Sequence, residues 1–303
     1  MITIQQEIEL LKKAKNAVVL AHTYQPADVQ DIADYVGDSY GLSVEASKIS
    51  ADIIIFCGVR FMAETAAILN PERIVILPEP DAGCPMADMI VAEDLIELKN
   101  KYPDYLVMCY VNSTADIKAL SDVCCTSSNA VAIAKKLPSD KGIIFVPDMH
   151  LGSVVQEQTG REMVLWEGFC PTHLRITPKM LTNARQMYPG SVIMIHPEAA
   201  HECRILADQV LSTGQMCDYV RNSDIEQFVV ATEIGILHTL EKNNPEKVFI
   251  PLSEELSCPN MKKGNILSVK KALEGVSGEV IKINNEVASK AIVSLRKMLE
   301  LSK

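Results

Sequence analysis

The sequence predicts an α/β protein made of three similar three-layer α/β/α lobes with parallel sheets, in a pseudo-threefold arrangement around a central active site. An internal repeat is the first observation behind this prediction. His22, Tyr24, Asp34 and Ser39 fall on Tyr110, Asn112, Asp122 and Ser127 after a shift of 88 residues, and on His196, Glu198, Asp208 and Thr213 after a shift of 174. The second observation is a set of continuous apolar runs at 53–56, 143–146 and 228–231, typical of parallel strands buried on both faces. The third is that Cys84, Cys170 and Cys258, spaced by 86 and 88 residues, each precede proline.

The repeat also predicts the domain organisation. A period of about 87 residues is the size of a small domain and is too long for a solenoid unit. We therefore expect lobes at 1–87, 88–174 and 175–303, the last including C-terminal helices that close on the body. Three independent domains on linkers are the alternative, but no Gly/Ser-rich or Pro-rich linker separates the copies.

The spacing of apolar residues and the positions of proline and turn residues predict the elements of the first lobe. Ile4, Ile8 and Leu11 predict an amphipathic helix over 3–15. Residues 18–21 are a predicted strand, 27–36 a helix after Pro26, and 37–39 a turn that opens a further helix. A strand at 51–58, a helix at 61–69, a strand at 73–77 and a loop at 78–85 that carries Cys84 complete the lobe.

The other two lobes repeat this order. The second has predicted strands at 106–111, 143–146 and 162–166, and predicted helices at 115–120, 129–137 and 151–159, the last closed by Gly160. The third has strands at 191–195, 228–232 and 248–251, a hydroxyl-bearing loop at 212–214 and a helix at 234–242. Residues 264–303 are predicted to be helices.

Composition favours a cytoplasmic enzyme with small-molecule substrates. The net charge of −10 argues against nucleic acid or an anionic membrane as a partner. The first residues do not resemble a signal peptide, and no apolar run reaches the roughly 20 residues of a membrane helix. Nine cysteines, an odd number, indicate thiols in a reducing compartment rather than a disulfide framework.

The repeat predicts that polar side chains meet at one place. Ligands of parallel sheets bind at the carboxyl ends of the strands, and each lobe has a pair of polar residues there. The pairs are His22 and Tyr24, Tyr110 and Asn112, and His196 and Glu198. Each residue alone would pass as a core histidine or an ordinary loop residue, but together they form a general acid–base set without an obvious nucleophile.

Three hydroxyl residues in register, Ser39, Ser127 and Thr213, lie near predicted helix N-termini. A single hydroxyl at such a place is most often a cap. Three in register favour a site for a phosphate or carboxylate, because free backbone amides and the helix dipole attract anions.

The three cysteines in register predict a metal centre. Three thiolates suit zinc poorly unless a histidine adds a fourth ligand. They suit a [4Fe-4S] cluster that keeps one iron open, which then acts as a Lewis acid. Buried structural cysteines are the alternative, and the other six cysteines, which lack the register, fit it. No Gly-x-Gly-x-x-Gly motif or P-loop indicates nucleotide binding.

Ten motifs run in order along the chain: Ala21-His-Thr-Tyr-Gln25, Gly37-Asp-Ser39, Phe61-Met-Ala-Glu64, Cys84-Pro-Met-Ala87, Tyr110-Val-Asn-Ser-Thr114, Cys170-Pro-Thr-His173, His196-Pro-Glu198, Ser212-Thr-Gly-Gln-Met216, Thr232-Glu-Ile-Gly235 and Asn260-Met-Lys262. In these motifs the sequence resembles the quinolinate synthase family. The resemblance implies three α/β/α lobes around one [4Fe-4S] cluster. It also implies condensation of iminoaspartate with dihydroxyacetone phosphate to quinolinate, phosphate and water, in the de novo route to NAD.

The resemblance further implies roles for particular residues. Cys84, Cys170 and Cys258 would be the cluster ligands. Substrate would contact His22, Ser39, Tyr110, Asn112, Ser127, His196, Glu198 and Thr213, and catalysis would involve Tyr24, Tyr110, His196 and Glu198. It implies a functional link to an aspartate oxidase or dehydrogenase that produces iminoaspartate. Thr23 replaces the usual Asn of the family, and the extra Cys-x-x-Cys of some members is absent after Cys258.

Two other functions remain open at this point. One is a zinc or iron hydro-lyase that uses the same three thiolates. The other is a non-catalytic iron–sulfur sensor, which needs an interaction surface such as a basic DNA-binding element, and the sequence contains none.

Overall fold

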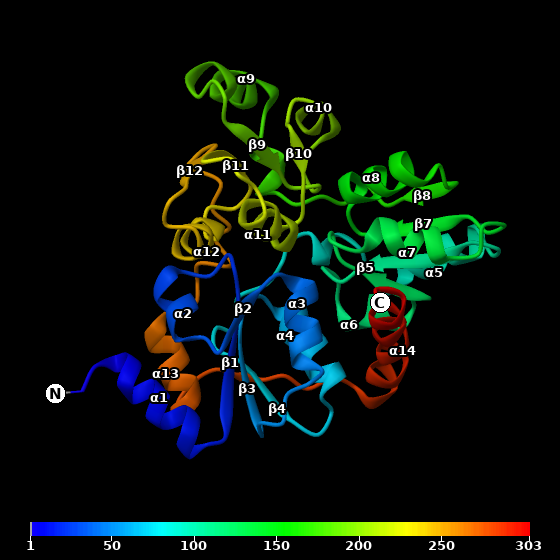
Figure 1. Cartoon of the computed structure of the whole chain (residues 1–303). Coiled ribbons are helices and arrows are strands. Elements are labelled where there is room, and N and C mark those ends of the chain that lie inside the picture. Colours follow the sequence, from blue (N-terminus) through cyan, green and yellow to red (C-terminus); the bar gives the residue numbers. More distant parts are fainter. Residues whose placement is uncertain (1) are drawn as a thin grey trace.

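A computed structural model describes residues 2–303, and within that range it contains three parallel sheets flanked by helices (Figure 1). The predicted α/β class with three similar lobes is confirmed. When the strands of each lobe are numbered in chain order, they lie in the order four, three, one, two in all three sheets. The sequence repeat is therefore a structural repeat.

The first sheet contains β1 (Ala17–His22), β2 (Tyr35–Gly37), β3 (Ile53–Cys57) and β4 (Ile74–Leu77). Helices α1 (Ile4–Ala14) and α2 (Ala27–Ile32) pack on one face, while α3 (Ser39–Ala46) and α4 (Arg60–Leu69) pack on the other. Successive side chains of a strand point to opposite faces of the sheet. Val19 and Ala21 therefore belong to the apolar cluster on one face of this sheet, and Leu20 belongs to the cluster on the other. Both faces are buried, which explains the continuous apolar run of each strand.

The second lobe contains β5 (Leu106–Tyr110), β6 (Val123–Cys125), β7 (Ile143–Val146) and β8 (Met163–Leu165), with α5 (Ala92–Lys101), α6 (Ala115–Ala119), α7 (Ala130–Lys136) and α8 (Met149–Thr159). The third contains β9 (Val192–Ile195), β10 (Gln209–Val210), β11 (Gln227–Ala231) and β12 (Val248–Pro251), with α9 (Pro178–Met187), α10 (His201–Arg204), α11 (Thr213–Arg221) and α12 (Ile236–Asn243). Short 3-10 helices, η1 (Ala87–Met89) and η2 (His173–Arg175), follow Cys84 and Cys170. Helices α5, α9 and α10 lie in segments for which no helix was predicted.

The prediction of one helix over 27–36 is wrong. Helix α2 ends at Ile32, and the chain then forms the short edge strand β2, as it forms β6 and β10 in the other lobes. The repeated aspartate is the cause. The carboxylates of Asp34, Asp122 and Asp208 accept hydrogen bonds from the backbone N–H of Val19, Val107 and Ile193, at 2.7, 2.8 and 2.7 Å. The backbone N–H of each aspartate donates back to the carbonyl of the same strand residue, at 2.9, 3.0 and 3.0 Å. This two-way pairing holds the chain beside the strand.

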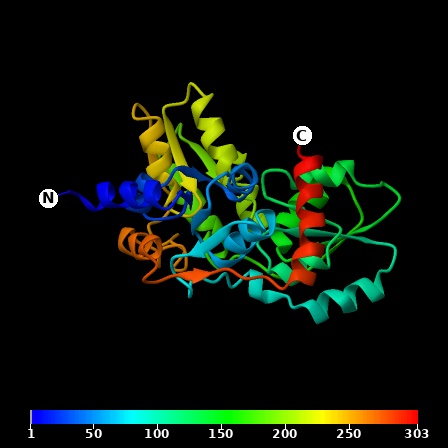
Figure 2. The same ribbon diagram turned by 90° about the horizontal axis from the view of Figure 1, so that it is seen from below.

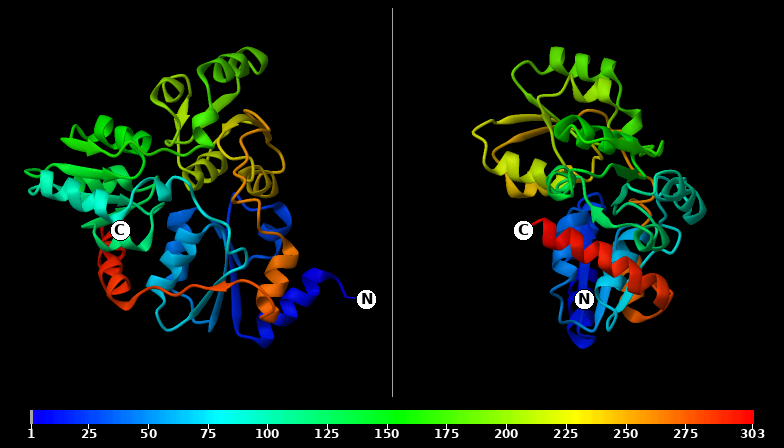
Figure 3. Two further views of the ribbon diagram at one scale, coloured as in Figure 1. Left: turned by 180° about the vertical axis from the view of Figure 1, so that it is seen from behind. Right: turned by 90° about the vertical axis from the view of Figure 1, so that its right-hand side faces the viewer.

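The C-terminal residues leave the third lobe and pack on the other two. Helix α13 (Ile266–Glu274) lies against α1, and β13 (Glu279–Val280) joins β4 antiparallel. Helix α14 (Asn285–Leu301) lies against α6 and β6 of the second lobe, as Figure 2 and the left panel of Figure 3 show. The predicted helices of 264–303 are thus present, while the boundaries at 87/88 and 174/175 stay a prediction. Among residues 2–303, no helix combines the length and the apolar character that crossing a membrane requires.

Candidate active site

One cavity between the three lobes is lined by every residue that the sequence predicted for the site, whereas the repeated aspartates do not line it. The predicted residues are His22, Tyr24, Ser39, Cys84, Tyr110, Asn112, Ser127, Cys170, His196, Glu198, Thr213 and Cys258. Each lobe contributes four of them, all at or after the carboxyl ends of its strands. The carboxyl ends of parallel strands are the usual place for a ligand, because loops from several strands converge there.

The polar pairs are held by short turns directly after the first strand of each lobe. His22 ends β1, and its Nδ1 accepts a hydrogen bond of 3.1 Å from the backbone N–H of Tyr24. His196 follows β9, and its Nδ1 accepts one of 3.3 Å from the N–H of Glu198. In these two pairs the histidine therefore fixes the backbone of the residue two positions later.

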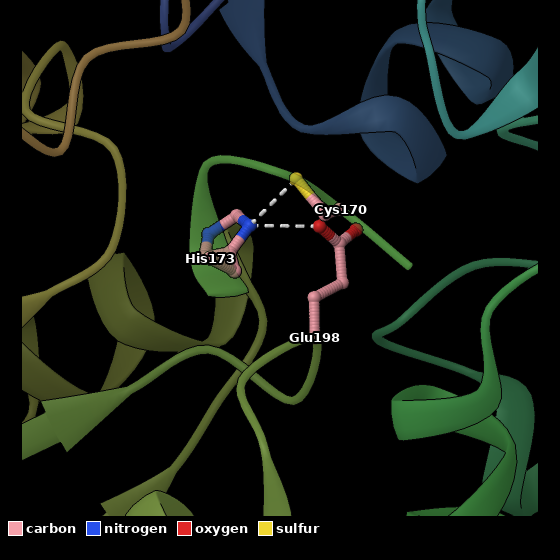
Figure 4. Close-up of side chains that lie close together, drawn as sticks. All are labelled: Cys170, His173 and Glu198. Atoms are coloured by element: carbon pink, nitrogen blue, oxygen red, sulfur yellow. Dashed lines mark hydrogen bonds and ion pairs between the residues drawn. The ribbon is translucent and has the colours of Figure 1, made fainter. Parts of the chain in front are cut away.

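A buried network of hydrogen bonds joins the lobes around the cavity, and Figure 4 shows the contact between His173 and Glu198 within it. Glu198 Oε1 accepts from the Tyr110 hydroxyl at 2.5 Å, and Oε2 lies 2.8 Å from Nδ1 of His173. The Nε2 of His173 lies 2.8 Å from Oγ1 of Thr232, which lies 2.6 Å from the hydroxyl of Tyr24. Protons can therefore be exchanged along side chains of all three lobes without bulk water.

Burial and hydrogen bonding set the protonation states. Burial lowers the pKa of His22 to about 3 and that of His196 to about 3, so both rings are neutral at pH 7. Burial opposes ionisation of Glu198, but His173 and the Tyr110 hydroxyl, which contact its two oxygens, outweigh burial and lower the pKa of that carboxyl. Burial, followed by the Glu198 charge, raises the pKa of Tyr110 well above its usual value. The site therefore places the carboxylate of Glu198 beside the neutral imidazole of His196 and the protonated hydroxyl of Tyr110.

The hydroxyls of Ser39 and Thr213 are not the helix caps. Asp38 caps α3 by accepting from the N–H of Gly41 at 2.8 Å, and Ser212 caps α11 by accepting from that of Gln215 at 3.3 Å. Ser39 and Thr213 come next in the chain, each at the first helical position, and both line the cavity. A hydroxyl at this position beside the cavity is suited to bind an anion.

The thiols of Cys84, Cys170 and Cys258 meet at the cavity from three different loops. Burial raises the pKa of Cys84 to about 12, and the charges of Glu198 and Cys258 add to it. Burial, then Glu198, also raises the pKa of Cys170, with a smaller contribution from Cys84. Metal binding displaces thiol protons, so a metal at this place would bind Cys84 and Cys170 as thiolates.

Other donors surround the thiols. The Nδ1 of His173 lies 3.2 Å from Sγ of Cys170, and ligand atoms of Cys170, His173 and Glu198 all lie within 4.8 Å of one another (Figure 4). The three thiols, with this imidazole and carboxylate beside them, fit a metal centre.

Several residues of the site were not identified from the sequence. His173, Thr232, Glu233 and Lys262 fall inside the quoted motifs, but nothing in the repeat marks them. Glu233 is fully buried, accepts from the backbone N–H of Cys258 at 3.0 Å and pairs with Lys262 at 2.9 Å. Lys262 also donates to the carbonyl of Tyr24. This pair therefore links the third cysteine loop to the first lobe.

Comparison with known proteins gives consistent results over almost the full length. A family model described as "Quinolinate synthetase A protein" matches residues 6–300. The quinolinate synthase of Dehalococcoides mccartyi strain CBDB1 is 48% identical over 298 residues, which cover 98% of either chain. That of Caldicellulosiruptor saccharolyticus is 50% identical over 300 residues, covering 99% of this chain and 98% of the relative. That of Geotalea uraniireducens is 46% identical over 298 residues, covering 98% and 97%.

Proposed function

Because this chain belongs to the quinolinate synthase family, we propose that it condenses iminoaspartate with dihydroxyacetone phosphate to quinolinate, phosphate and two molecules of water, in de novo NAD biosynthesis. The observation that carries the proposal is the single cavity in which three thiols and an acid–base network from three lobes come together. Iminoaspartate would be supplied by a reaction that oxidises the amine of aspartate, as an aspartate oxidase or dehydrogenase does.

Cys84, Cys170 and Cys258 would hold one [4Fe-4S] cluster. Their convergence from three loops on one cavity supports three protein ligands and leaves one iron without a fourth cysteine. When bound, the cluster supplies a Lewis acid at that open iron, which polarises a carbonyl or a leaving hydroxyl.

The anionic substrates need neutral hydrogen-bond donors, and the cavity provides them. Ser39, Ser127 and Thr213 would bind a carboxylate or the phosphate, together with Asn112 and the neutral imidazoles of His22 and His196. Neutral donors avoid the cost of burying further cations with no permanent partner. They also leave the site able to release phosphate.

Proton transfer would fall to Glu198 and the groups bonded to it. Carbon–carbon bond formation requires loss of a proton from the carbon of iminoaspartate that attacks, and the ionised Glu198 can accept it at a carboxylate oxygen. Tyr110 and His173 donate to the same carboxylate and hold its orientation. Tyr24 is hydrogen-bonded to Thr232 at the other end of the network, and its hydroxyl can supply a proton to a departing hydroxyl.

An anaerobic assay tests the proposal. Iron–sulfur-reconstituted protein is mixed with freshly generated iminoaspartate and dihydroxyacetone phosphate, and quinolinate and phosphate are quantified. We expect both products in equal amounts, about four iron and four sulfide per chain, and no product from metal-free protein. A colourless zinc protein that dehydrates a hydroxy acid would instead show a hydro-lyase, and a reconstituted protein that forms no quinolinate would refute the proposed reaction.

A further inference from the structure

Three buried side chains occupy equivalent positions of the repeat although they are chemically different. Gln30 becomes Lys118 after a shift of 88 residues and Arg204 after a shift of 174. Each lies in the helix that follows the first strand of its lobe, α2, α6 or α10. Their exposed fractions are only 4%, 0% and 5%. Long polar side chains are seldom buried this deeply unless their donors are used.

Each side chain donates to a carbonyl of its own lobe, five residues earlier. The bonds run from Gln30 Nε2 to Gln25 O at 2.9 Å, from Lys118 Nζ to Ser113 O at 2.8 Å and from Arg204 Nη1 to Ala199 O at 2.7 Å. These three carbonyls belong to the residues directly after Tyr24, Asn112 and Glu198. The bonds therefore hold the loops that carry the second polar residue of each pair.

The same nitrogen atom also donates to a neighbouring lobe. Gln30 Nε2 reaches Gly235 O of the third lobe at 2.9 Å, Lys118 Nζ reaches Phe61 O of the first at 3.2 Å, and Arg204 Nη1 reaches His150 O of the second at 3.3 Å. The acceptors are equivalent, since each lies four residues beyond the end of β11, β3 or β7. The three contacts close a ring, in which every lobe is bonded to the next.

Further bonds use the remaining polar atoms. Arg204 Nη2 donates to Ser153 Oγ at 2.8 Å and to Glu157 at 3.2 Å, both on α8 of the second lobe. Gln30 Oε1 accepts from Thr239 Oγ1 at 2.7 Å, on α12 of the third lobe. The ammonium of Lys118 lies 5.4 Å from the centre of the Phe61 ring. If one of these side chains moved away from its acceptors, its donors would be buried without a hydrogen-bond partner. The free-energy cost of that state holds each side chain in place.

We propose that Gln30, Lys118 and Arg204 are positioning residues that fix the loops of Tyr24, Asn112 and Glu198 against the neighbouring lobe. A single nitrogen bonded to both carbonyls makes the position of each loop depend on the packing between lobes. The kinetic part of this inference rests on the proposed function, while the structural part does not. Catalysis is sensitive to such positioning, because a displacement of about 1 Å can cost about 100-fold in rate.

The experiment compares variants of the full chain. Lys118→Met removes the donor and keeps an apolar stem, whereas Lys118→Gln keeps a donor and reproduces the residue of the first lobe. Lys247→Met is the matched control, since Lys247 also donates to two carbonyls, Val220 O at 2.5 Å and Ser223 O at 2.6 Å, but both lie in its own lobe. Hydrogen exchange is measured on metal-free protein, and kcat and KM on reconstituted protein.

In Lys118→Met we expect amides of residues 111–115 and 61–64 to exchange at least about tenfold faster, the effect of losing a buried hydrogen bond. We expect kcat to fall about tenfold or more, KM to change less, and iron content to stay at the wild-type value, because none of the three cysteines lies in these loops. Lys118→Gln should recover part of both effects, and Lys247→Met should show neither.

Two results would overturn the inference. One is equal exchange of these amides in Lys118→Met and Lys247→Met, and the other is a Lys118→Gln protein as impaired as Lys118→Met. If Lys118→Met does not fold, Gln30→Met, which changes no charge, takes its place. The exchange of the amides of residues 22–26 is then compared between Gln30→Met and Lys247→Met. If wild-type protein forms no quinolinate, the proposed function fails, whereas the exchange data still decide whether the three side chains hold the loops.

Discussion

His173 Nδ1 lies 2.8 Å from Oε2 of Glu198, and the two side chains are 3% and 5% exposed. The contact joins the loop of the second cysteine to the polar loop of the third lobe. Because the other oxygen of Glu198 accepts from Tyr110, this carboxylate has a donor on either side. Its charge is thus stabilised by hydrogen bonds rather than by a neighbouring lysine or arginine.

Glu198→Gln tests whether that charge is needed for turnover. Gln matches the shape and keeps a hydrogen-bond acceptor, so the fold, the iron content and KM should change little. We expect kcat to fall about 100-fold or more, the usual scale for losing a general acid or base. Anaerobic kcat and iron content are measured on one sample. A near-normal kcat with full iron would show that Glu198 is only a structural acceptor, and proton transfer would be reassigned to Tyr24 or His196.

Substitution of the cysteines in register tests the ligand assignment. Cys84→Ala, Cys170→Ala and Cys258→Ala should each lose the cluster absorbance and the activity, because each removes one thiolate ligand. Cys203→Ala and Cys217→Ala are the matched controls, as neither residue lines the cavity. Iron, sulfide and product formation are determined for all five. A Cys84→Ala protein with a full cluster would contradict the assignment.

The buried His22 predicts a pH dependence of stability. Its pKa is about 3 in the folded protein and about 6.5 in the unfolded chain, so below pH 6.5 the unfolded chain binds a proton that the folded protein does not. The free energy of unfolding should therefore fall as the pH is lowered from about 6.5 toward 3, by up to about 1.4 kcal/mol per pH unit from this group.

Urea unfolding of metal-free wild-type protein and of His22→Asn at pH 6.5 and pH 5 measures this contribution. Asn can still accept from the N–H of Tyr24 but does not titrate. The variant should lose less stability than the wild type over this interval. Equal losses would mean that His22 is charged in the folded protein or that its environment is more open than the structure shows.

The repeated aspartate predicts a stability effect distant from catalysis. Asp122→Ala removes the acceptor for the N–H of Val107 and leaves that strand end without its side-chain bond. We expect a loss of about 1–3 kcal/mol in the free energy of unfolding, the range for a buried donor left unsatisfied. Asp122→Asn, which keeps an oxygen acceptor, should lose less. Chemical denaturation of both variants gives the comparison, and an unchanged midpoint for Asp122→Ala would contradict this role.

The register of the repeat predicted many of the side chains that line the cavity, but it did not mark His173 or Glu233. His22, Tyr110 and His196 differ in chemistry, yet each is the residue at or just after the end of an equivalent strand, and position in the repeat does not depend on chemistry. The same register also contains Gln30, Lys118 and Arg204, but a glutamine, a lysine and an arginine on short helices look like unrelated surface residues until their burial is known.

Other features depend on tertiary contacts that no local pattern encodes. The helical periodicity of 27–36 is overridden because Asp34 pairs with Val19, 15 residues away. Glu233 and Lys262 meet because the third cysteine loop folds back over the first lobe, and Gly235 permits this, since an added Cβ there would lie 2.7 Å from Cα of Tyr24. Residues 264–303 were predicted to be helices, but their path across the first and second lobes was not predicted. That path depends on which faces of the two lobes are not covered by the helices of those lobes.

The path of α14 has a consequence for the order in which the chain folds during synthesis. Ser294, on this helix, is fully buried and donates to the carbonyl of Lys118, 176 residues earlier. When the second lobe leaves the ribosome, one of its apolar faces is therefore still exposed to solvent. That face is covered only after α14 has been synthesised. Contacts of such long sequence separation form late and slowly, and the nascent chain is prone to aggregate until then. A chain truncated before α14 would leave this apolar face exposed, and we expect such a chain to be prone to aggregation and to proteolysis.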